Sequence, residues 1–465
     1  MHPQLQHDLD QLPELLRQTT ALALDFLRAL PERPAGASFP APPPEALPSE
    51  GLGLAAALAH FQHRYGAGLS GSAGPRYWGF VTGGATPAAL AGDWLTSTFD
   101  QNVFGGSEPA GQALERETLG RLRQLFGLSA AHAGAFVSGA TMANVVGLAL
   151  GRQWAARRLG FSAAEDGLAG QPALTVLSGT PHSSIYKALA LLGLGRHSLR
   201  PVAVQPGREA VDLAALRREL QALAGRPVIV VGNAGTVNTA DFDDLAGLAE
   251  LKREFDFWLH VDGAFGGFAA CAPRYRPLVH GLDEADSLTI DAHKWLNVPY
   301  DSAMQFTRRP DLQMEVFQNS GAYLGALTAE PDFVHLTPEN SRRWRALPAW
   351  FTLQAYGAEG YQEIVERDCA LAQALGERIA AAAEFELLAP VRLNVVCFTL
   401  AGRPSAEQVQ AYLAALRATG AVFLTPTVYQ GRPAIRAALS NWRTQPADVD
   451  QAWEALLAVA QRGGL

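Results

Sequence analysis

The sequence lacks the features that mark several protein classes. Three cysteines occur, Cys271, Cys369 and Cys397, at wide spacings that fit neither a disulfide framework nor a CxxC metal site. No apolar run approaches the roughly 20 residues that cross a bilayer, and no basic segment followed by an apolar run marks a signal peptide at the N-terminus. We therefore expect a cytoplasmic protein with reduced thiols, no metal site and no membrane partner.

Positive charge is scarce as well. Lys and Arg number 37 against 45 Asp and Glu, which gives a formal net charge of −8 and no basic excess to neutralise a phosphate backbone. Nucleic acid is therefore not an expected partner. With 48% hydrophobic residues in 465, the chain can build a large core and more than one domain of about 150 residues.

The common nucleotide-binding signatures are also missing. No GxxxxGK[ST] sequence occurs, and neither Gly51-Leu52-Gly53 nor Gly193-Leu194-Gly195 completes a GxGxxG after a strand. These absences disfavour a nucleotide-dependent enzyme.

The first 75 residues differ in pattern from the rest. Apolar residues recur at nearly helical spacing over 7–30, which predicts an amphipathic helix. Seven prolines between Pro31 and Pro48 predict an extended connector, because proline is excluded from helix and sheet interiors. We expect residues 1–75 to form a helical arm that either clasps another subunit or packs on its own chain.

Short β-branched runs alternate with helical stretches in the middle of the chain. The predicted strands cover 173–178, 199–205, 227–232, 257–262, 287–291 and 302–307. The alternation predicts a mainly parallel sheet covered on both faces, within a large α/β domain at 76–346.

The pattern changes near residue 347. A long helical stretch to residue 379 is followed by predicted strands at 394–400 and 433–439 with a helix at 405–419 between them. This predicts a smaller C-terminal α+β domain at 347–465.

Two residues at predicted strand ends suggest chemistry. Lys294 lies between His293 and Trp295, where partial desolvation favours the neutral amine that Schiff-base formation needs. Asp262 ends an apolar strand and is followed by small residues that allow a flat ligand to approach the backbone. Taken singly, Lys294 could instead be an exposed lysine in a salt bridge, and Asp262 could be an aspartate in a turn.

Two further segments complete the pattern. Ala140 and Thr141 open a predicted helix whose free N–H groups could bind an anion, although such residues are often simple caps. His182 follows another predicted strand, where a lone histidine is more often structural. Along the chain, a phosphate-binding helix start, an aromatic ring at His182, a carboxylate at Asp262 and a lysine at Lys294 match the groups that pyridoxal phosphate (PLP) requires.

Five segments carry a family resemblance. They are SGATMAN (138–144), PHSSIYKA (181–188), GNAGTVNTADFDD (232–244), HVDGAFGG (260–267) and DAHKW (291–295). From about Arg76 onward the chain resembles the group II PLP-dependent amino-acid decarboxylases, which include the aromatic L-amino acid, glutamate and diaminobutyrate enzymes. The resemblance implies the aspartate-aminotransferase-like fold, known as fold type I. It also implies a homodimer with active sites at the subunit interface, in which the N-terminal arm of each subunit packs against the other subunit.

The resemblance also implies residue roles. Lys294 would hold the cofactor as a Schiff base, and Asp262 would partner the pyridine nitrogen. The other matching cofactor contacts are His182 and Ala264 on opposite faces of the ring, Thr236 beside it, and Ala140, Thr141 and His293 at the phosphate.

The sequence departs from the family in places. Asp291 stands where aromatic amino-acid decarboxylases commonly have Asn, so we expect its charge to turn away from the phosphate. Trp78 and Phe80 match a substrate shelf, but Val81 and Thr82 replace bulkier pocket residues.

A second departure concerns a predicted loop. Residues 318–341 resemble the family's mobile loop, whose tyrosine helps to protonate Cα. Phe333 aligns with that tyrosine, and Tyr323 and His335 lie nearby in the sequence.

The favoured function is PLP-dependent decarboxylation of an L-amino acid to an amine and CO2 through a Lys294 Schiff base, a carboxy-lyase reaction of amino-acid metabolism. Phe333 leaves an aldehyde-forming decarboxylase as an alternative. Arg436 could bind a substrate carboxylate, so an aminotransferase is a second alternative, and a non-catalytic homodimeric scaffold is a third. The sequence does not identify the substrate side chain.

Overall fold

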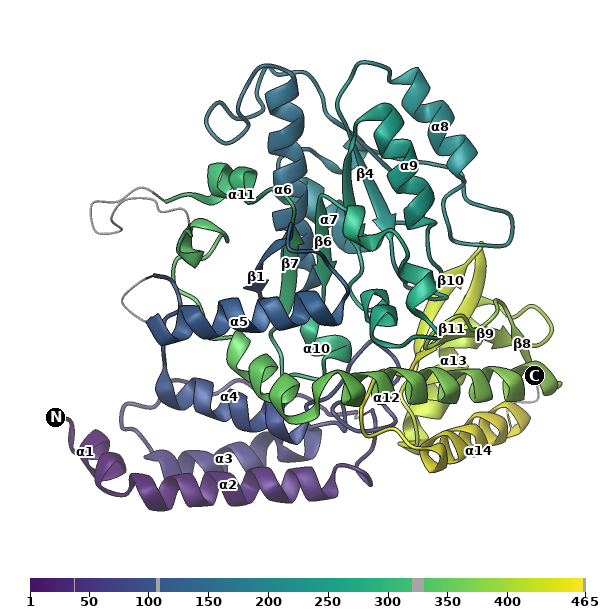
Figure 1. Ribbon diagram of the computed structural model, residues 1–465. Coiled ribbons are helices and arrows are strands. Elements are labelled where there is room, and N and C mark those ends of the chain that lie inside the picture. Colours follow the sequence, from purple (N-terminus) through teal and green to yellow (C-terminus); the bar gives the residue numbers. More distant parts are fainter. Residues whose placement is uncertain (37, 106–108, 320–329, 463–465) are drawn as a thin grey trace.

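A seven-stranded sheet forms the centre of the larger domain (Figure 1). The computed structural model describes residues 1–36, 38–105, 109–319 and 330–462. The strands are β1 (Ala133–Val137), β2 (Thr175–Ser178), β3 (Leu199–Pro201), β4 (Val228–Asn233), β5 (Trp258–Asp262), β6 (Ser287–Ile290) and β7 (Ala303–Thr307). Their order is β1-β7-β6-β5-β4-β2-β3, in which β2 to β6 are parallel and β7 runs antiparallel to both of its neighbours. The predicted mainly parallel α/β sheet is confirmed.

Helices cover both faces of this sheet. The helix α6 (Ala140–Arg158) packs across β4 to β7, with α7 (Ser183–Leu191) and α11 (Pro310–Phe317) beside it. On the other face lie α8 (Leu213–Ala222) and α9 (Leu245–Phe255) (Figure 1). Every residue of β4 and β5 is buried, as expected for parallel strands between two helical layers.

The smaller domain has a four-stranded antiparallel sheet of order β10-β11-β9-β8. Its strands are β8 (Phe385–Leu387), β9 (Val395–Leu400), β10 (Thr425–Tyr429) and β11 (Arg432–Ala438). The helices are α12 (Ala346–Ala381), α13 (Ala406–Thr419) and α14 (Pro446–Arg462). A kink at Gly357, with φ 59°, divides α12, which runs from the large domain to the small one (Figure 1).

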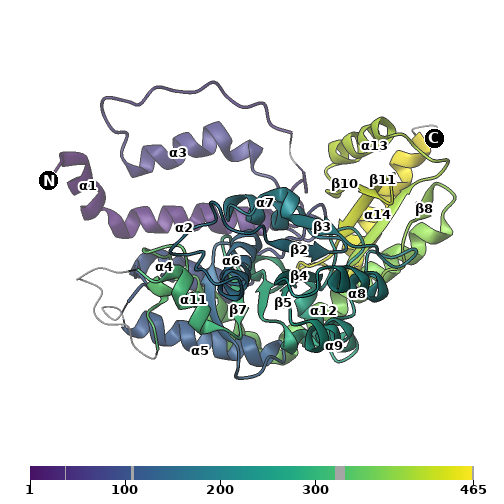
Figure 2. The ribbon, with the colours of Figure 1, turned by 90° about the horizontal axis from the view of Figure 1, so that it is seen from above.

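The N-terminal helix predicted over 7–30 is two helices, α1 (Pro3–Asp10) and α2 (Leu12–Ala29). Pro13 explains the break, since it has no N–H to continue α1 but is tolerated in the first turn of α2. The connector leads to α3 (Leu54–Tyr65), and Figure 2 shows it looping away from the rest of the chain. The helices α4 (Pro87–Phe99) and α5 (Pro109–Leu125) then lead into β1.

Short helical turns complete the fold. They are η1 (Gly66–Gly68), η2 (Arg196–Ser198), η3 (Gly266–Cys271), η4 (Arg276–Val279), η5 (Leu282–Glu284), η6 (Phe333–His335) and the single-turn helix α10 (Ala292–Trp295). Among the described helices, none has both the length and the apolar character that would span a bilayer.

Candidate active site

A cavity of about 270 Å³ opens at the carboxyl ends of β4 and β5, where ligands of parallel sheets gather. Its lining comes from both domains and consists of Phe80, Val81, Ala140, Thr180, His182, Asn233, Gly235, Thr236, Val237, Asp262, Ala264, Phe265, His293, Lys294, Tyr300 and Arg436. The cavity thus brings together seven of the eight residues predicted to bind a cofactor. The eighth, Thr141, lies next to Ala140 in the first turn of α6, half-buried and outside the lining.

Asp262 ends β5 and is held at both carboxylate oxygens. Its Oδ1 accepts a hydrogen bond of 3.1 Å from the backbone N–H of Ala264, and its Oδ2 accepts one of 3.0 Å from Asn144 Nδ2. The side chain is buried at 7% exposure. Two donors therefore fix how the carboxylate is presented to the cavity.

Lys294 lies in α10, directly after β6 and Asp291. Its Nζ is 3.5 Å from Asp291 Oδ2 and 5.7 Å from the centre of the Phe265 ring. Asp291 does not line the cavity, and its buried carboxylate pairs with Lys294 and also lies 3.1 Å from His293 Nε2. Residue 291 directly precedes α10, which places both side chains within reach, and a buried carboxylate left unpaired would be strongly destabilising.

His182 caps α7. The backbone N–H of Ser184 points to His182 Nδ1 at 3.3 Å, and the Ser184 hydroxyl lies 2.7 Å from the same nitrogen. Desolvation lowers the pKa of the His182 ring, and the charges of Lys294 and Arg436 act in the same direction against that of Asp262. The ring is therefore neutral at physiological pH.

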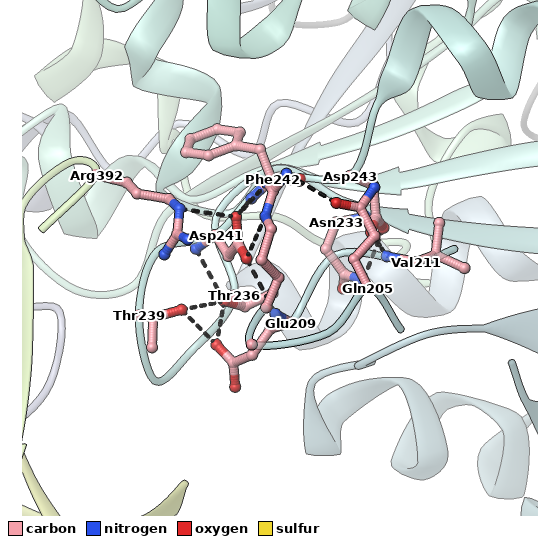
Figure 3. A network of polar contacts seen from close by, with 12 residues as sticks. Gln205, Glu209, Val211, Asn233, Thr236, Thr239, Asp241, Phe242, Asp243 and Arg392 are labelled. Carbon is pink, nitrogen blue, oxygen red and sulfur yellow. Dashed lines mark hydrogen bonds and ion pairs between the residues drawn. The ribbon is translucent and has the colours of Figure 1, made fainter. Parts of the chain in front are cut away.

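Thr236 belongs to the loop after β4, whose polar contacts Figure 3 shows. Its hydroxyl donates to Glu209 Oε2 at 2.5 Å, and Thr239 donates to the same oxygen at 2.7 Å. Asn238 Nδ2 donates to the other Glu209 oxygen at 2.9 Å. One buried carboxylate thus fixes the loop that forms this wall of the cavity.

Two aspartates of the same loop hold it to the surrounding chain (Figure 3). Asp241 pairs with Arg208 at 2.6 Å and with Arg392, which precedes β9, at 3.3 Å. Asp243 accepts from the backbone N–H groups of Val211 and Asn233 at 2.6 and 2.7 Å, and burial raises its pKa to about 6. The loop is therefore tied to both domains.

Arg436 of β11 contributes a buried cation to the cavity. Its Nη1 donates to the Gly79 carbonyl at 3.2 Å, whereas Nε and Nη2 have no hydrogen-bond partner among the described residues. Burial lowers the pKa of Arg436 to about 10, so the guanidinium is still charged near neutral pH. A buried guanidinium with free donors favours a negatively charged ligand group.

Two aromatic side chains lie at the mouth of the cavity. Phe80 is 55% exposed and Tyr300 is 62% exposed. The Tyr300 hydroxyl lies 3.3 Å from Thr82 Oγ1. These rings offer apolar surface to whatever enters.

The prediction that Trp78 contacts substrate is wrong. Trp78 is fully buried in the core of the small domain, and its indole N–H donates to the Pro75 carbonyl at 2.8 Å. Its backbone bonds to Phe423 and Ala438, so the segment joins the small domain and turns residue 78 inward.

The prediction for Phe333 is corrected as well. Phe333 is 2% exposed in the core of the large domain, with the Arg116 and Arg342 guanidiniums 5.3 and 4.9 Å from its ring centre. It does not line the cavity. His335 is buried too, and Tyr323 lies outside the described residues.

These residues fit pyridoxal phosphate. Lys294 offers an amine for its aldehyde, Asp262 a carboxylate for its pyridine nitrogen, and the start of α6 free N–H groups for its phosphate. A Cβ at Gly139 would lie 3.3 Å from His293 Cε1, so a small residue lets the helix start approach that ring closely.

Comparison with known proteins agrees with this geometry. Residues 43–401 match the pyridoxal-dependent decarboxylase conserved domain. The chain belongs to the pyridoxal-dependent decarboxylase family. It is a PLP-dependent amino-acid decarboxylase, and family membership favours this activity over the aminotransferase and scaffold alternatives.

Individual relatives cover most of the chain. An aromatic-L-amino-acid decarboxylase of Bacillus atrophaeus is 27% identical over 83% of this chain and 81% of its own length. A 4-hydroxyphenylacetaldehyde synthase of Rhodiola rosea is 27% identical over 90% and 87%. The crystal structure of Oryza sativa TDC with PLP and tryptamine superposes with a TM-score of 0.89 at 23% identity, covering 98% of each chain. The fold type I architecture is confirmed.

Several residues of the site were not predicted from the sequence. Asn233 ends β4 as Asp262 ends β5, so the strand-end argument could have found it. Phe265 lies within the HVDGAFGG segment, which could have indicated it, whereas Tyr300 lies outside every segment that carries the resemblance. Asn144 and Ser184 do not line the cavity but hold residues that do.

Proposed function

We propose that this decarboxylase acts on an L-amino acid with an aromatic side chain and releases the corresponding amine and CO2. The observation that carries the proposal is the composition of the cavity, which the exposed aromatic residues Phe80 and Tyr300 line together with the buried guanidinium of Arg436. An aromatic side chain would cover those rings. The activity named for the Bacillus atrophaeus relative supports the same substrate class.

Charge in the cavity also favours a neutral side chain. Arg436 has free donors for one carboxylate, and every amino acid brings an α-carboxylate. Lys294, which also lines the cavity, pairs with Asp291 and is assigned to the cofactor. Among the described residues of the lining, an acidic side chain would therefore find no second free arginine or lysine.

The residue roles follow from these positions. With PLP bound, Lys294 would attach it, Asp262 would keep a proton at its pyridine nitrogen, and His182 would present a neutral ring to it. Bound PLP supplies an electron-accepting ring to the bond that breaks. Arg436 orients the substrate through a carboxylate, and the aromatic mouth limits the entry of water.

Amine is proposed over aldehyde because the sequence argument for aldehyde depended on Phe333. That side chain is enclosed in the core of the large domain, so it does not stand in for a proton donor at the cavity. The aldehyde-forming activity named for the Rhodiola rosea relative makes the product worth measuring directly.

The test is a substrate screen with the holoenzyme. CO2, amine and peroxide are measured together for tryptophan, tyrosine, phenylalanine, DOPA, glutamate and diaminobutyrate. We expect kcat/KM to be highest for an aromatic substrate, with amine equal to CO2. Preference for glutamate or diaminobutyrate would refute the substrate class, and peroxide equal to CO2 would refute the amine product.

We also propose a cytoplasmic homodimer. Leucines of the arm are exposed by 40–63%, at positions 5, 9, 12, 16 and 24, and an apolar groove of about 580 Å³ lies between α2, α3 and α4. A second copy would bury this surface, which is unusual for a monomer to expose. Three free, buried cysteines suit a reducing compartment.

A further inference from the structure

Asn144 is the centre of a buried polar network that joins Asp262 to His182. Its side chain is fully buried in the second turn of α6. The amide nitrogen donates to Asp262 Oδ2 at 3.0 Å and to Ser184 Oγ at 3.1 Å. The amide oxygen accepts from Thr289 Oγ1 at 2.7 Å and lies 2.9 Å from His260 Nε2. All four hydrogen-bonding positions of the amide are thus filled.

The direction of these bonds follows from Asp262, because a carboxylate only accepts and the part of the Asn144 amide that faces it is therefore the NH2 group. The Trp258 indole N–H, at the other end of the network, can only donate. It donates to Ser287 Oγ at 3.0 Å, and that hydroxyl lies 2.8 Å from His260 Nδ1. With its NH2 group toward Asp262, Asn144 turns its oxygen toward His260, so the neutral His260 ring carries its proton on Nε2 and its Nδ1 accepts from Ser287. Burial lowers the pKa of His260 to about 4, so the ring is neutral near pH 7. The amide oxygen of Asn144 is therefore the acceptor, and its NH2 group points to Asp262.

The same direction continues to His182. The backbone N–H of Ser184 points to His182 Nδ1, so this nitrogen is an acceptor. The Ser184 hydroxyl accepts from Asn144 and donates to the same Nδ1 at 2.7 Å. The neutral His182 ring then carries its proton on Nε2.

Two glycines of α6 allow this contact. A Cβ at Gly147, one turn after Asn144, would lie 2.6 Å from His260 Cε1 and Nδ1. A Cβ at Gly151 would lie 2.9 Å from Trp258 Cδ1. The glycines let the helix lie directly against β5, which brings the amide into reach of the strand-end carboxylate.

We propose that Asn144 is a positioning residue for the decarboxylation, acting through the carboxylate of Asp262 and, by way of Ser184, through the ring of His182. The proposal rests on the roles proposed above for these two residues. Asn144 has no place in the cavity lining, so its effect on the reaction is indirect.

The test uses the holoenzyme and Asn144→Leu, which has a similar volume but no donor. We expect the variant to retain bound cofactor while kcat falls about 10- to 100-fold, since a charge-assisted hydrogen bond is lost. The pH at which the visible absorption of the bound cofactor changes should also move, because the partner of the pyridine nitrogen is less firmly held. A purely structural role would not move that pH.

Gln153→Leu is the matched control. Gln153 is a buried amide of the same helix, bonded to Ser162 and Glu315 and outside the cavity lining. Its loss should lower the thermal midpoint but leave kcat and the absorption titration unchanged. If Asn144→Leu does not fold, Asn144→Ala replaces it, since the smaller side chain also removes the donor to Asp262 and adds no second charge beside it.

A double-variant cycle then tests whether the effect of Asn144 on kcat passes through Asp262. In an Asp262→Asn background, Asn144→Leu should lower kcat clearly less than it does in the wild-type enzyme, because the route through the Asp262 carboxylate is already lost and only the route through His182 remains. Independent, multiplying effects would overturn the proposal, as would unchanged kcat and absorption in Asn144→Leu while Asp262→Asn is impaired. A fully active Asp262→Asn would instead refute the role of Asp262, and this proposal with it.

Discussion

Replacing Asp262 by Asn should separate two contributions of this residue, its charge and its hydrogen bonds. The carboxylate accepts from Asn144 and from the Ala264 N–H. An amide at 262 has one acceptor oxygen, so its NH2 group must face one of the two donors. A buried donor left unsatisfied costs about 1–3 kcal/mol, which sets the expected loss of folding stability.

The loss of charge should be larger in the kinetics. Electrostatic stabilisation of developing charge is typically worth about 10²- to 10³-fold in kcat, so we expect a decrease of that size with some cofactor still bound. In the exchange variant Asp262→Asn/Asn144→Asp, the amide now at position 262 can donate to the carboxylate now at position 144, so the bond between the two side chains is restored in the opposite direction. It should recover most of the stability but not kcat.

The assays are thermal unfolding of the apo and holo forms at one pH and steady-state kcat with the best amino acid found in the screen. Recovery of kcat in the exchange variant would refute the need for a charge at position 262. An Asp262→Asn variant as stable as the wild type would refute the hydrogen-bond argument.

Three other changes have definite expectations. Arg436→Met should raise the KM for the amino acid about 10- to 100-fold, because a charge-assisted contact with the substrate is lost, and should change cofactor affinity little. Steady-state kinetics and cofactor titration measure the two quantities. An unchanged KM would contradict the role assigned to Arg436. Burial raises the pKa of Asp368 to about 8, above its unfolded value, so its contribution to stability is complete below about pH 4 and is lost as the pH rises through 8. Asp368→Asn keeps an acceptor for the Trp295 indole N–H, and its thermal midpoint should therefore fall less than that of the wild type between pH 6 and 9; parallel curves would contradict this. Deleting residues 1–48 should give monomers or an unstable, cofactor-poor dimer by light scattering, whereas a fully active dimer would make the arm dispensable.

The sheet was predictable where strands are rich in β-branched residues. The β4 sequence VIVVGN was predicted within one residue at each end, and β5 likewise. The strand β1, of sequence AGAFV, was not predicted, because alanine and glycine are weak strand formers and its place at the sheet edge depends on pairing with β7.

The site was predictable where it depends on strand ends. Lys294 and Asp262 meet because parallel strands end at one edge of the sheet. Trp78 and Phe333 were misplaced, because which aromatic side chain turns into a core depends on contacts distant in sequence. The bonds of Asn144 join four elements, α6, α7, β5 and β6, and no local pattern contains that information.

The site of cofactor attachment is the most direct test of the proposed active site. The chain has three lysines, Lys187, Lys252 and Lys294, and among them Lys294 lines the cavity. Lys187 is exposed on α7, and Lys252 pairs with Asp286 at 3.0 Å. Borohydride reduction of the holoenzyme followed by peptide mapping should place the pyridoxyl group on Lys294 alone, with no stable adduct in Lys294→Ala. An adduct on Lys187 or Lys252 would contradict the active site described here.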